Sequence, residues 1–234
     1  MSDAEARTVT RPQVLRRLLN LYHEPRYLEV GVFAGRTFHR VPAARKVAVD
    51  PEFRFDHHER ARAHPEATYH QVTSDEYFNV LASPEDLFDV IYLDGLHEFG
   101  QTLRDLLNAL EHLQPRGVIV IDDTRPHTSL ASIPDRARFF EERSALGVED
   151  QAWMGDVYKV VHFVQAFCPY LSYRTISNNH GQTVVWRQQR NEAPLSTIEA
   201  IAAMGFEEFA RSQDVLRLKR FGWIRHAVRR DLGL

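Results

Sequence analysis

The chain has 234 residues, a formal net charge of −3 and 44% hydrophobic residues, a balance typical of one globular domain. This charge gives no reason to expect nucleic acid as a partner, and no apolar stretch approaches the length of a membrane span. The single cysteine, Cys168, excludes an intrachain disulfide, and the polar N-terminus lacks the apolar core of a signal peptide. We therefore expect a cytoplasmic protein.

Short apolar runs alternate with helical patterns through the first half of the chain. The spacing of apolar residues predicts an N-terminal helix over 11–23, the start of a helix at 36–43, and helices over 57–64, 74–82 and 98–113. The runs between them predict strands over 27–31, 46–50, 67–72, 88–94 and 117–123. Strands that alternate with helices predict an α/β fold, with a parallel sheet covered on both faces.

The second half follows a different pattern. A helix over 156–167 precedes two strands, 171–177 and 182–188, which an Asn/Gly turn joins into a hairpin, so we expect the last strand to be antiparallel. The connection before that helix has about 30 residues, which is longer than an ordinary strand-to-helix loop, and it suits a short helix at 134–143. This connection is either a substrate loop or a surface insertion without function. Residues 194–234 predict two helices broken near Gly205. We expect one domain over 1–190, with 191–234 as its helical extension.

Acidic residues stand at or just past the end of each of the five predicted parallel strands. They are Glu29, Asp50, Asp75, Asp94, Asp122 and Asp123. Unpaired carboxylates are costly inside a sheet that is buried on both faces, so packing does not explain them. Open α/β sheets bind ligands outside the carboxyl ends of their strands. The acids therefore predict a ligand site at this edge.

The turn "EVGVFAGRTF" (29–38) indicates which ligand. Gly31 and Gly35 would let a cofactor approach the backbone, and the helix expected next would offer free N–H groups to a carboxylate. Asp50 follows Glu29 after the interval of about 20 residues that is usual for an acid binding ribose hydroxyls. Both a dinucleotide and S-adenosylmethionine (SAM) contain such a ribose. Phe33 stands where a dinucleotide fingerprint needs its second glycine, which favours SAM.

Three segments carry a resemblance to a known family: "LEVGVFAGRTF", "VAVD" and "FDVIYLDGLHEFGQTLRDLLNALEHLQPRGVIVIDDT". With them the chain resembles the class I SAM-dependent methyltransferases, and most of all the bacterial small-molecule branch of macrocin-type and sugar O-methyltransferases. The resemblance covers roughly residues 26–187 by the order of elements. It implies a Rossmann-like sheet of seven strands with helices on both faces and an antiparallel last strand.

The resemblance also implies roles for residues at the strand ends. In the family, the positions that match Glu29, Gly31 and Gly35 hold the methionine end of SAM. The position that matches Asp50 holds the ribose, and the positions that match Ser74 and Asp75 lie beside the adenine. The candidates for cofactor binding are Glu29, Gly31, Gly35, Thr37, Asp50, Ser74, Asp75 and Asp94.

Asp94, Asp122 and Asp123 stand at neighbouring strand ends and are the candidate metal ligands. Three carboxylates without a cation would repel one another, and Mg²⁺ prefers oxygen ligands. In metal-dependent O-methyltransferases that resemble this chain, matching acids bind a divalent ion that holds two substrate oxygens. The alternative is that Asp122 caps the next element and only Asp94 faces SAM.

His97, three residues after Asp94, is the candidate catalytic base, with Asp94 as the second candidate catalytic residue. A histidine at this position could take the proton of the acceptor near neutral pH. The structural alternative is that His97 only holds Asp94 or Asp105 by a hydrogen bond.

These patterns predict a SAM-dependent methyltransferase that acts on a hydroxyl of a small molecule, such as a sugar or a natural-product precursor, with or without Mg²⁺. One alternative is a metal-independent methyltransferase, for oxygen or nitrogen, with His97 as the base. Another is a SAM-binding protein without activity, and a nicotinamide oxidoreductase is more distant. We expect no nucleic-acid or membrane partner, and the sequence leaves a homodimer open.

Overall fold

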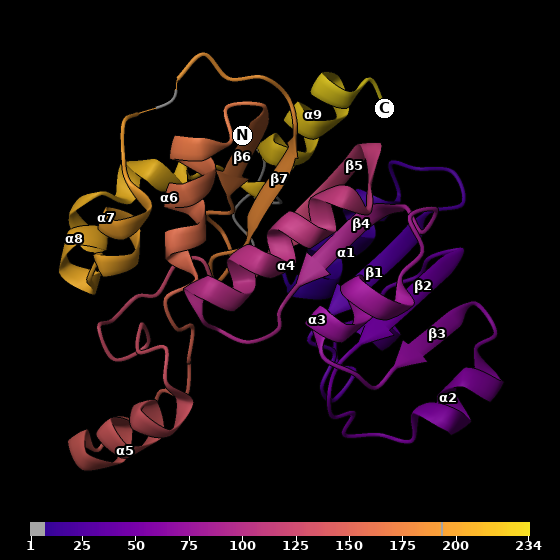
Figure 1. The fold of residues 1–234 in the computed structure, drawn as a ribbon, viewed down its shortest axis with the longest axis horizontal. Coiled ribbons are helices and arrows are strands. Elements are labelled where there is room, and N and C mark those ends of the chain that lie inside the picture. Colours follow the sequence, from indigo (N-terminus) through magenta and orange to yellow (C-terminus); the bar gives the residue numbers. More distant parts are fainter. Residues whose placement is uncertain (1–7, 193) are drawn as a thin grey trace.

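The computed structural model describes residues 8–192 and 194–234, which form a seven-stranded sheet with helices on both faces (Figure 1). The strand order is β3-β2-β1-β4-β5-β7-β6. The first five strands are parallel, and β7 is antiparallel to both of its neighbours, β5 and β6. The strands are β1 (Arg26–Val30), β2 (Arg45–Val49), β3 (Ala67–His70), β4 (Phe88–Leu93), β5 (Leu113–Ile121), β6 (Leu171–Thr175) and β7 (Thr183–Arg187). The predicted fold class is confirmed.

Alternating strand residues bury the two faces of the sheet against different helices. On one face, α1 and α9 pack over Tyr27 and Val90; on the other, α4 and α6 pack over Leu28 and Ile91. Because both faces are covered, the ligands of this sheet can enter only at its edges or strand ends. The helices are α1 (Arg11–Leu19), α2 (His57–Ala63), α3 (Ser74–Glu76), α4 (Phe99–Glu111), α5 (Arg136–Leu146), α6 (Tyr158–Phe167), α7 (Ile198–Ala203), α8 (Phe206–Arg211) and α9 (Phe221–Leu232).

The helix expected after the glycine turn does not form. In its place is a single 3₁₀ turn, Phe38–Arg40, that ends at Val41. The buried Lys46 ammonium donates to the carbonyl oxygens of Phe38, at 3.0 Å, and Val41, at 3.1 Å. These bonds give the two carbonyl oxygens a partner outside the helix, and Pro42, which follows directly, has no N–H to continue it. The chain therefore leaves the helical turn and continues to β2. No helix N-terminus is therefore available beside the turn to bind a carboxylate.

Other predicted elements differ mainly at their boundaries. The first helix ends at Leu19 rather than at residue 23. Strand β5 begins four residues before the prediction, and its pairing with β4 shifts register between Phe88 and Val90 of β4. The C-terminal part contains three helices and a 3₁₀ turn, Gln213–Leu216, in place of two helices. Helix α5 confirms the short helix expected in the long connection.

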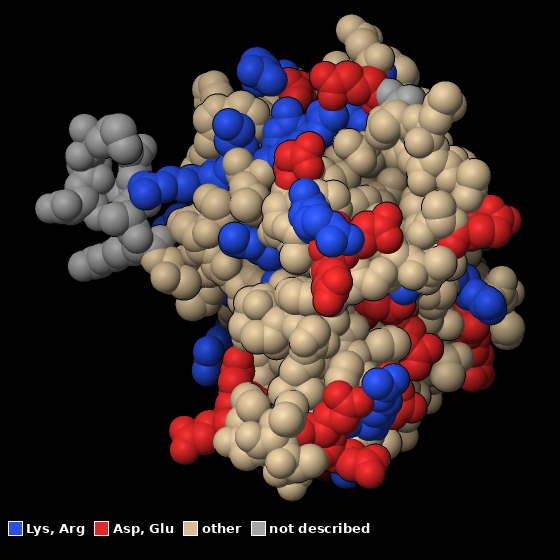
Figure 2. Space-filling view, turned by 90° about the vertical axis from the view of Figure 1, so that its left-hand side faces the viewer, with Lys and Arg blue, Asp and Glu red and all other residues tan. Residues whose placement is uncertain are grey.

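Basic and acidic side chains are interspersed on the face shown in Figure 2, in keeping with the small net charge. None of the helices in the described ranges is both long enough and apolar enough to span a membrane.

Candidate active site

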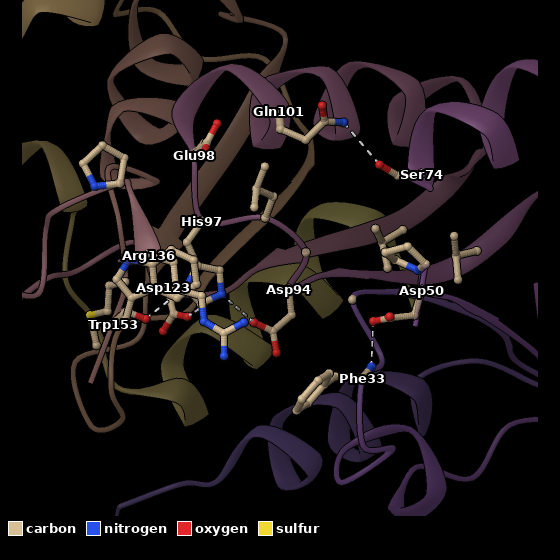
Figure 3. Close-up of a pocket in the computed structure, with 18 of the residues that line it drawn as sticks. Phe33, Asp50, Ser74, Asp94, His97, Glu98, Gln101, Asp123, Arg136 and Trp153 are labelled. Atoms are coloured by element: carbon tan, nitrogen blue, oxygen red, sulfur yellow. Dashed lines mark hydrogen bonds and ion pairs between the residues drawn. The ribbon is translucent and has the colours of Figure 1, made fainter. Parts of the chain in front are cut away.

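A cavity of about 850 Å³ opens at the carboxyl ends of the parallel strands (Figure 3). The long connection after β5 closes one side of it with Arg136, Trp153 and Met154. Of the sequence-predicted site residues, those that line the cavity are Gly31, Asp50, Ser74, Asp75, Asp94, His97 and Asp123. Those outside the lining are Glu29, Gly35, Thr37 and Asp122.

The glycine turn brings bare backbone to the cavity wall at Gly31. Its φ is +87°, and a Cβ added there would lie 1.9 Å from the carbonyl oxygen of Asp94, so only glycine fits. Gly35, at φ +69°, faces away from the cavity, where an added Cβ would meet the ring of His39. The turn thus exposes bare backbone to the cavity at its first glycine, while its second glycine packs against His39.

Asp50 is anchored from behind by backbone amides. Its two carboxylate oxygens accept one hydrogen bond each, from the N–H of Phe33 and the N–H of Glu52, both at 2.7 Å (Figure 3). Each oxygen keeps a second lone pair for a hydroxyl donor. Burial raises the pKa of Asp50, although the two amide bonds oppose that effect. The geometry suits an acid that binds the two hydroxyls of a ribose.

Glu29 lies behind the cavity wall and is 1% exposed. The Tyr27 hydroxyl donates to Glu29 Oε2 at 2.5 Å. Burial raises the pKa of Glu29 to about 8, and this hydrogen bond only partly offsets the effect. A direct contact with the methionine end of SAM stays a prediction for this residue, as it does for Gly35 and Thr37.

The predicted adenine side of the cavity is tied together by Gln101. Its Nε2 lies 3.2 Å from Ser74 Oγ, 3.2 Å from Asp75 Oδ1 and 3.0 Å from Asp105 Oδ1. Arg104 adds an ion pair with Asp75, at 3.1 Å. Asp105 is thus bonded within helix α4, and of the two acids that could hold His97, only Asp94 lies beside it.

Asp122 has partners on both carboxylate oxygens. Tyr92 donates to Oδ2 at 2.6 Å and His180 Nε2 contacts Oδ1 at 2.6 Å, while Arg11 Nε also bonds Oδ2. Burial alone would raise the pKa of Asp122, but the hydrogen bond and charge of His180, with the charge of Arg11, lower it overall. Asp122 is therefore a buried, ionised carboxylate with no free face toward the cavity.

Asp123 turns its carboxylate into the cavity from a backbone with φ +53°. One oxygen lies 3.3 Å from an Arg11 terminal nitrogen, and the other lies 3.2 Å from His97 Nε2. Burial and the neighbouring Asp122 charge raise the pKa of Asp123 to about 7. The positive φ, rare for a residue other than glycine, aims two consecutive aspartates in different directions.

His97 is held between the long connection and the carboxylates. Its Nδ1 lies 2.9 Å from the carbonyl oxygen of Trp153, and the two rings stack with centroids 4.5 Å apart. Because a carbonyl only accepts, Nδ1 carries a proton, and Nε2 is left facing Asp123 and Asp94, at 3.2 and 3.6 Å. Burial would lower the pKa of His97, but the hydrogen bond that its Nε2–H donates to Asp94 and the charges of both acids raise it to about 9.

Several cavity residues were not anticipated, among them Arg11, Arg136, Trp153 and His180. Arg11 is the first residue of the N-terminal helix, and His180 lies in the hairpin turn. No local sequence pattern indicates that either residue lies near the strand ends. For Trp153, the signal was its place in the long segment that was considered as a substrate loop.

The comparisons with known proteins agree with this geometry. Residues 28–124 match the family model described as a methyltransferase domain. A search among curated proteins finds no matching sequence. Two similar solved structures are the O-methyltransferase TomG from Streptomyces achromogenes, involved in tomaymycin synthesis and bound to SAM, and an O-methyltransferase from Bacillus cereus bound to SAH. TomG is 19% identical to this chain with a TM-score of 0.52, and the match covers 77% of this chain and 81% of TomG. The Bacillus cereus enzyme is 13% identical with a TM-score of 0.51, and the match covers 80% of this chain and 82% of that enzyme.

At these identities the solved structures establish the fold. The fold and the matched methyltransferase domain together confirm the resemblance to the class I SAM-dependent methyltransferases. Methyl transfer is the class of reaction that the matched domain supports.

Proposed function

We propose that this protein is a SAM-dependent O-methyltransferase that acts on a hydroxyl of a small molecule, such as a sugar or a natural-product precursor. The observation that carries the proposal is one cavity that joins Asp50, whose geometry suits a ribose, to a histidine–carboxylate group, His97 with Asp94 and Asp123. Its volume, about 850 Å³, suits a nucleoside cofactor together with a small acceptor.

The sulfonium of SAM is a built-in leaving group, so the protein must chiefly align the acceptor oxygen with the methyl group and remove a proton. Asp50 would fix the ribose, and the backbone at Gly31 would pass close to the cofactor. The acceptor would then lie beside His97, between the acids and Trp153.

His97 Nε2 is the proposed proton acceptor. Its Nδ1–H is held by the Trp153 carbonyl, which leaves Nε2 as the atom where a proton arrives and departs. Asp94 and Asp123 stabilise the imidazolium that forms. These acids therefore strengthen the base without touching the methyl group.

The arrangement does not fit Mg²⁺ at the three predicted acids. Both oxygens of Asp122 are already bonded, and the Arg11 guanidinium contacts both Asp122 and Asp123. Asp94, His97 and Asp123 have ligand atoms within 4.8 Å of one another, but a cation there would meet the same guanidinium on Asp123. Our mechanism therefore uses no metal, in line with the metal-independent alternative.

Thermal stability tests the cofactor class. A ligand that binds only the folded state raises the melting temperature. We expect SAM and S-adenosylhomocysteine to raise it and NAD to leave it unchanged, measured by differential scanning fluorimetry. A larger shift with NAD than with SAM would contradict the proposal, and turnover of any hydroxylated acceptor would exclude a purely SAM-binding role.

Replacing Asp50 tests the ribose contact. Asp50→Ala should weaken SAM binding by about 1.5–3 kcal/mol, the range for losing a charged hydrogen-bond acceptor, as measured by calorimetry. Asp214→Ala, at an exposed position outside the cavity lining, is the control and should bind SAM like the unaltered protein. Equal affinity in both variants would remove Asp50 from the site.

A further inference from the structure

Arg11 reaches the acidic cluster from the N-terminal helix, 111 residues before Asp122 in the chain. It is the first residue of α1, which packs on the sheet through Val14 and Leu15. The residue before it is fixed as well, because the Thr10 N–H donates to Gln13 Oε1 at 3.0 Å. The Arg11 side chain is 37% exposed and lines the cavity. The guanidinium is therefore presented to the cluster by a rigid element.

The guanidinium contacts two carboxylates at once. Nε bonds Asp122 Oδ2, and a terminal nitrogen lies 3.3 Å from Asp123 Oδ1. A guanidinium stays charged at every accessible pH, and its planar fork suits this two-carboxylate contact. A single cationic side chain therefore contacts both of these adjacent acids.

Basic side chains already surround the acids of the cluster. Three acids, Asp94, Asp122 and Asp123, face three basic groups from separate elements. The basic groups are Arg11, His97 and His180. Since repulsion among the acids is what would recruit a divalent ion, these bases remove the driving force for binding one.

We propose that Arg11 is a built-in replacement for a divalent cation: it bridges Asp122 and Asp123 with a fixed positive charge and keeps the site free of metal. By holding one oxygen of Asp123, it leaves the other to contact His97, so Arg11 acts as a positioning residue. The link to catalysis rests on the proposed methyltransferase function. The exclusion of metal does not, because it depends only on the folded protein.

Binding of Mn²⁺ to the folded protein, measured by electron paramagnetic resonance without SAM or acceptor, tests the inference. The unaltered protein should bind no Mn²⁺ at the cluster. Arg11→Ala should expose the carboxylates and bind about one Mn²⁺ per chain at concentrations at which the unaltered protein binds none. The site should vanish again when Asp122→Asn is added. Arg16→Ala, which removes an exposed arginine of the same helix, should resemble the unaltered protein.

Turnover gives a second readout. The unaltered protein should be insensitive to a chelator, Arg11→Lys should retain more activity than Arg11→Ala, and added Mn²⁺ should restore part of the activity of Arg11→Ala. Stoichiometric Mn²⁺ binding by the unaltered protein, lost on Asp122→Asn, would overturn the inference without the need for an Arg11 variant. A folded Arg11→Ala protein that gains no Mn²⁺ site would also overturn it. Absence of any methyl transfer would instead count against the proposed function alone.

Discussion

His97→Ala should lower turnover by roughly 10²–10⁴-fold at saturating SAM, the usual range for removing a general base. The expected loss follows from the position of Nε2, which faces the cavity while Nδ1 is held by the Trp153 carbonyl. SAM affinity should change little, because the base contacts the acceptor. Steady-state kinetics and SAM calorimetry on the same variant check both expectations.

His97→Gln separates a base from a structural residue. Glutamine keeps hydrogen-bonding capacity but cannot take the proton. If His97 only holds Asp94 and Asp123, His97→Gln should recover most of the turnover, and His97→Ala should also melt at a lower temperature. Near wild-type turnover for His97→Gln would exclude the base. His58→Ala, an exposed histidine on α2, is the control and should be unaffected.

The pH dependence of the unaltered protein gives an independent check. A base works in its neutral form, so turnover falls as pH drops through its pKa. The neighbouring acids raise the pKa of His97 from 6.5 to about 9, and the acid limb of kcat/KM should therefore lie well above pH 6.5. If the imidazolium were the working form, kcat/KM would instead fall as pH rises past about 9.

Gly31→Ala should have the largest effect on stability, lowering the free energy of unfolding by about 2–5 kcal/mol. Its φ of +87° is strained for any other residue, and the new Cβ would meet the carbonyl of Asp94, a backbone atom that cannot rotate away. The strand ends β1 and β4 would have to separate, so SAM binding should weaken as well. Urea unfolding and calorimetry measure the two effects.

Gly100→Ala is the matched control. Gly100 lies in helix α4, and nothing lies within 4 Å of an added Cβ. The variant should match or slightly exceed the stability of the unaltered protein, since alanine is the better helix former. If Gly31→Ala and Gly100→Ala behaved alike, the tight approach of β1 and β4 at Gly31 would be contradicted.

Hydrophobic periodicity was enough to predict the sheet and most of the helices that cover it. Apolar residues recur with a period of 2 in strands and 3.6 in helices, and this spacing shows which face of each element is buried. The pattern can be recognised within a single element, without knowledge of its neighbours. The antiparallel final strand could be predicted as well, because a short Asn/Gly turn between two strands permits no other direction. The same logic failed after Gly35, where Lys46 from the next strand ends the helical turn.

The acids of the site could also be located, because parallel strands end at a common edge. Asp94, His97 and Asp123 meet there as the spacing predicted. The partners of Asp122 could not be predicted in this way. An arginine in the first turn of a helix and a histidine in a hairpin are ordinary surface residues by pattern, and only the tertiary fold places Arg11 and His180 against one carboxylate.

The long reach of these two partners has a consequence for folding. Arg11 and His180 are 111 and 58 residues from Asp122 in the chain. A partly folded state with β4 and β5 in place, but without α1 and the hairpin, would leave the Asp122 carboxylate without its two basic partners, which is costly for a buried charge. Such intermediates are therefore disfavoured. The N-terminal helix, the central strands and the hairpin should fold and unfold in one cooperative transition.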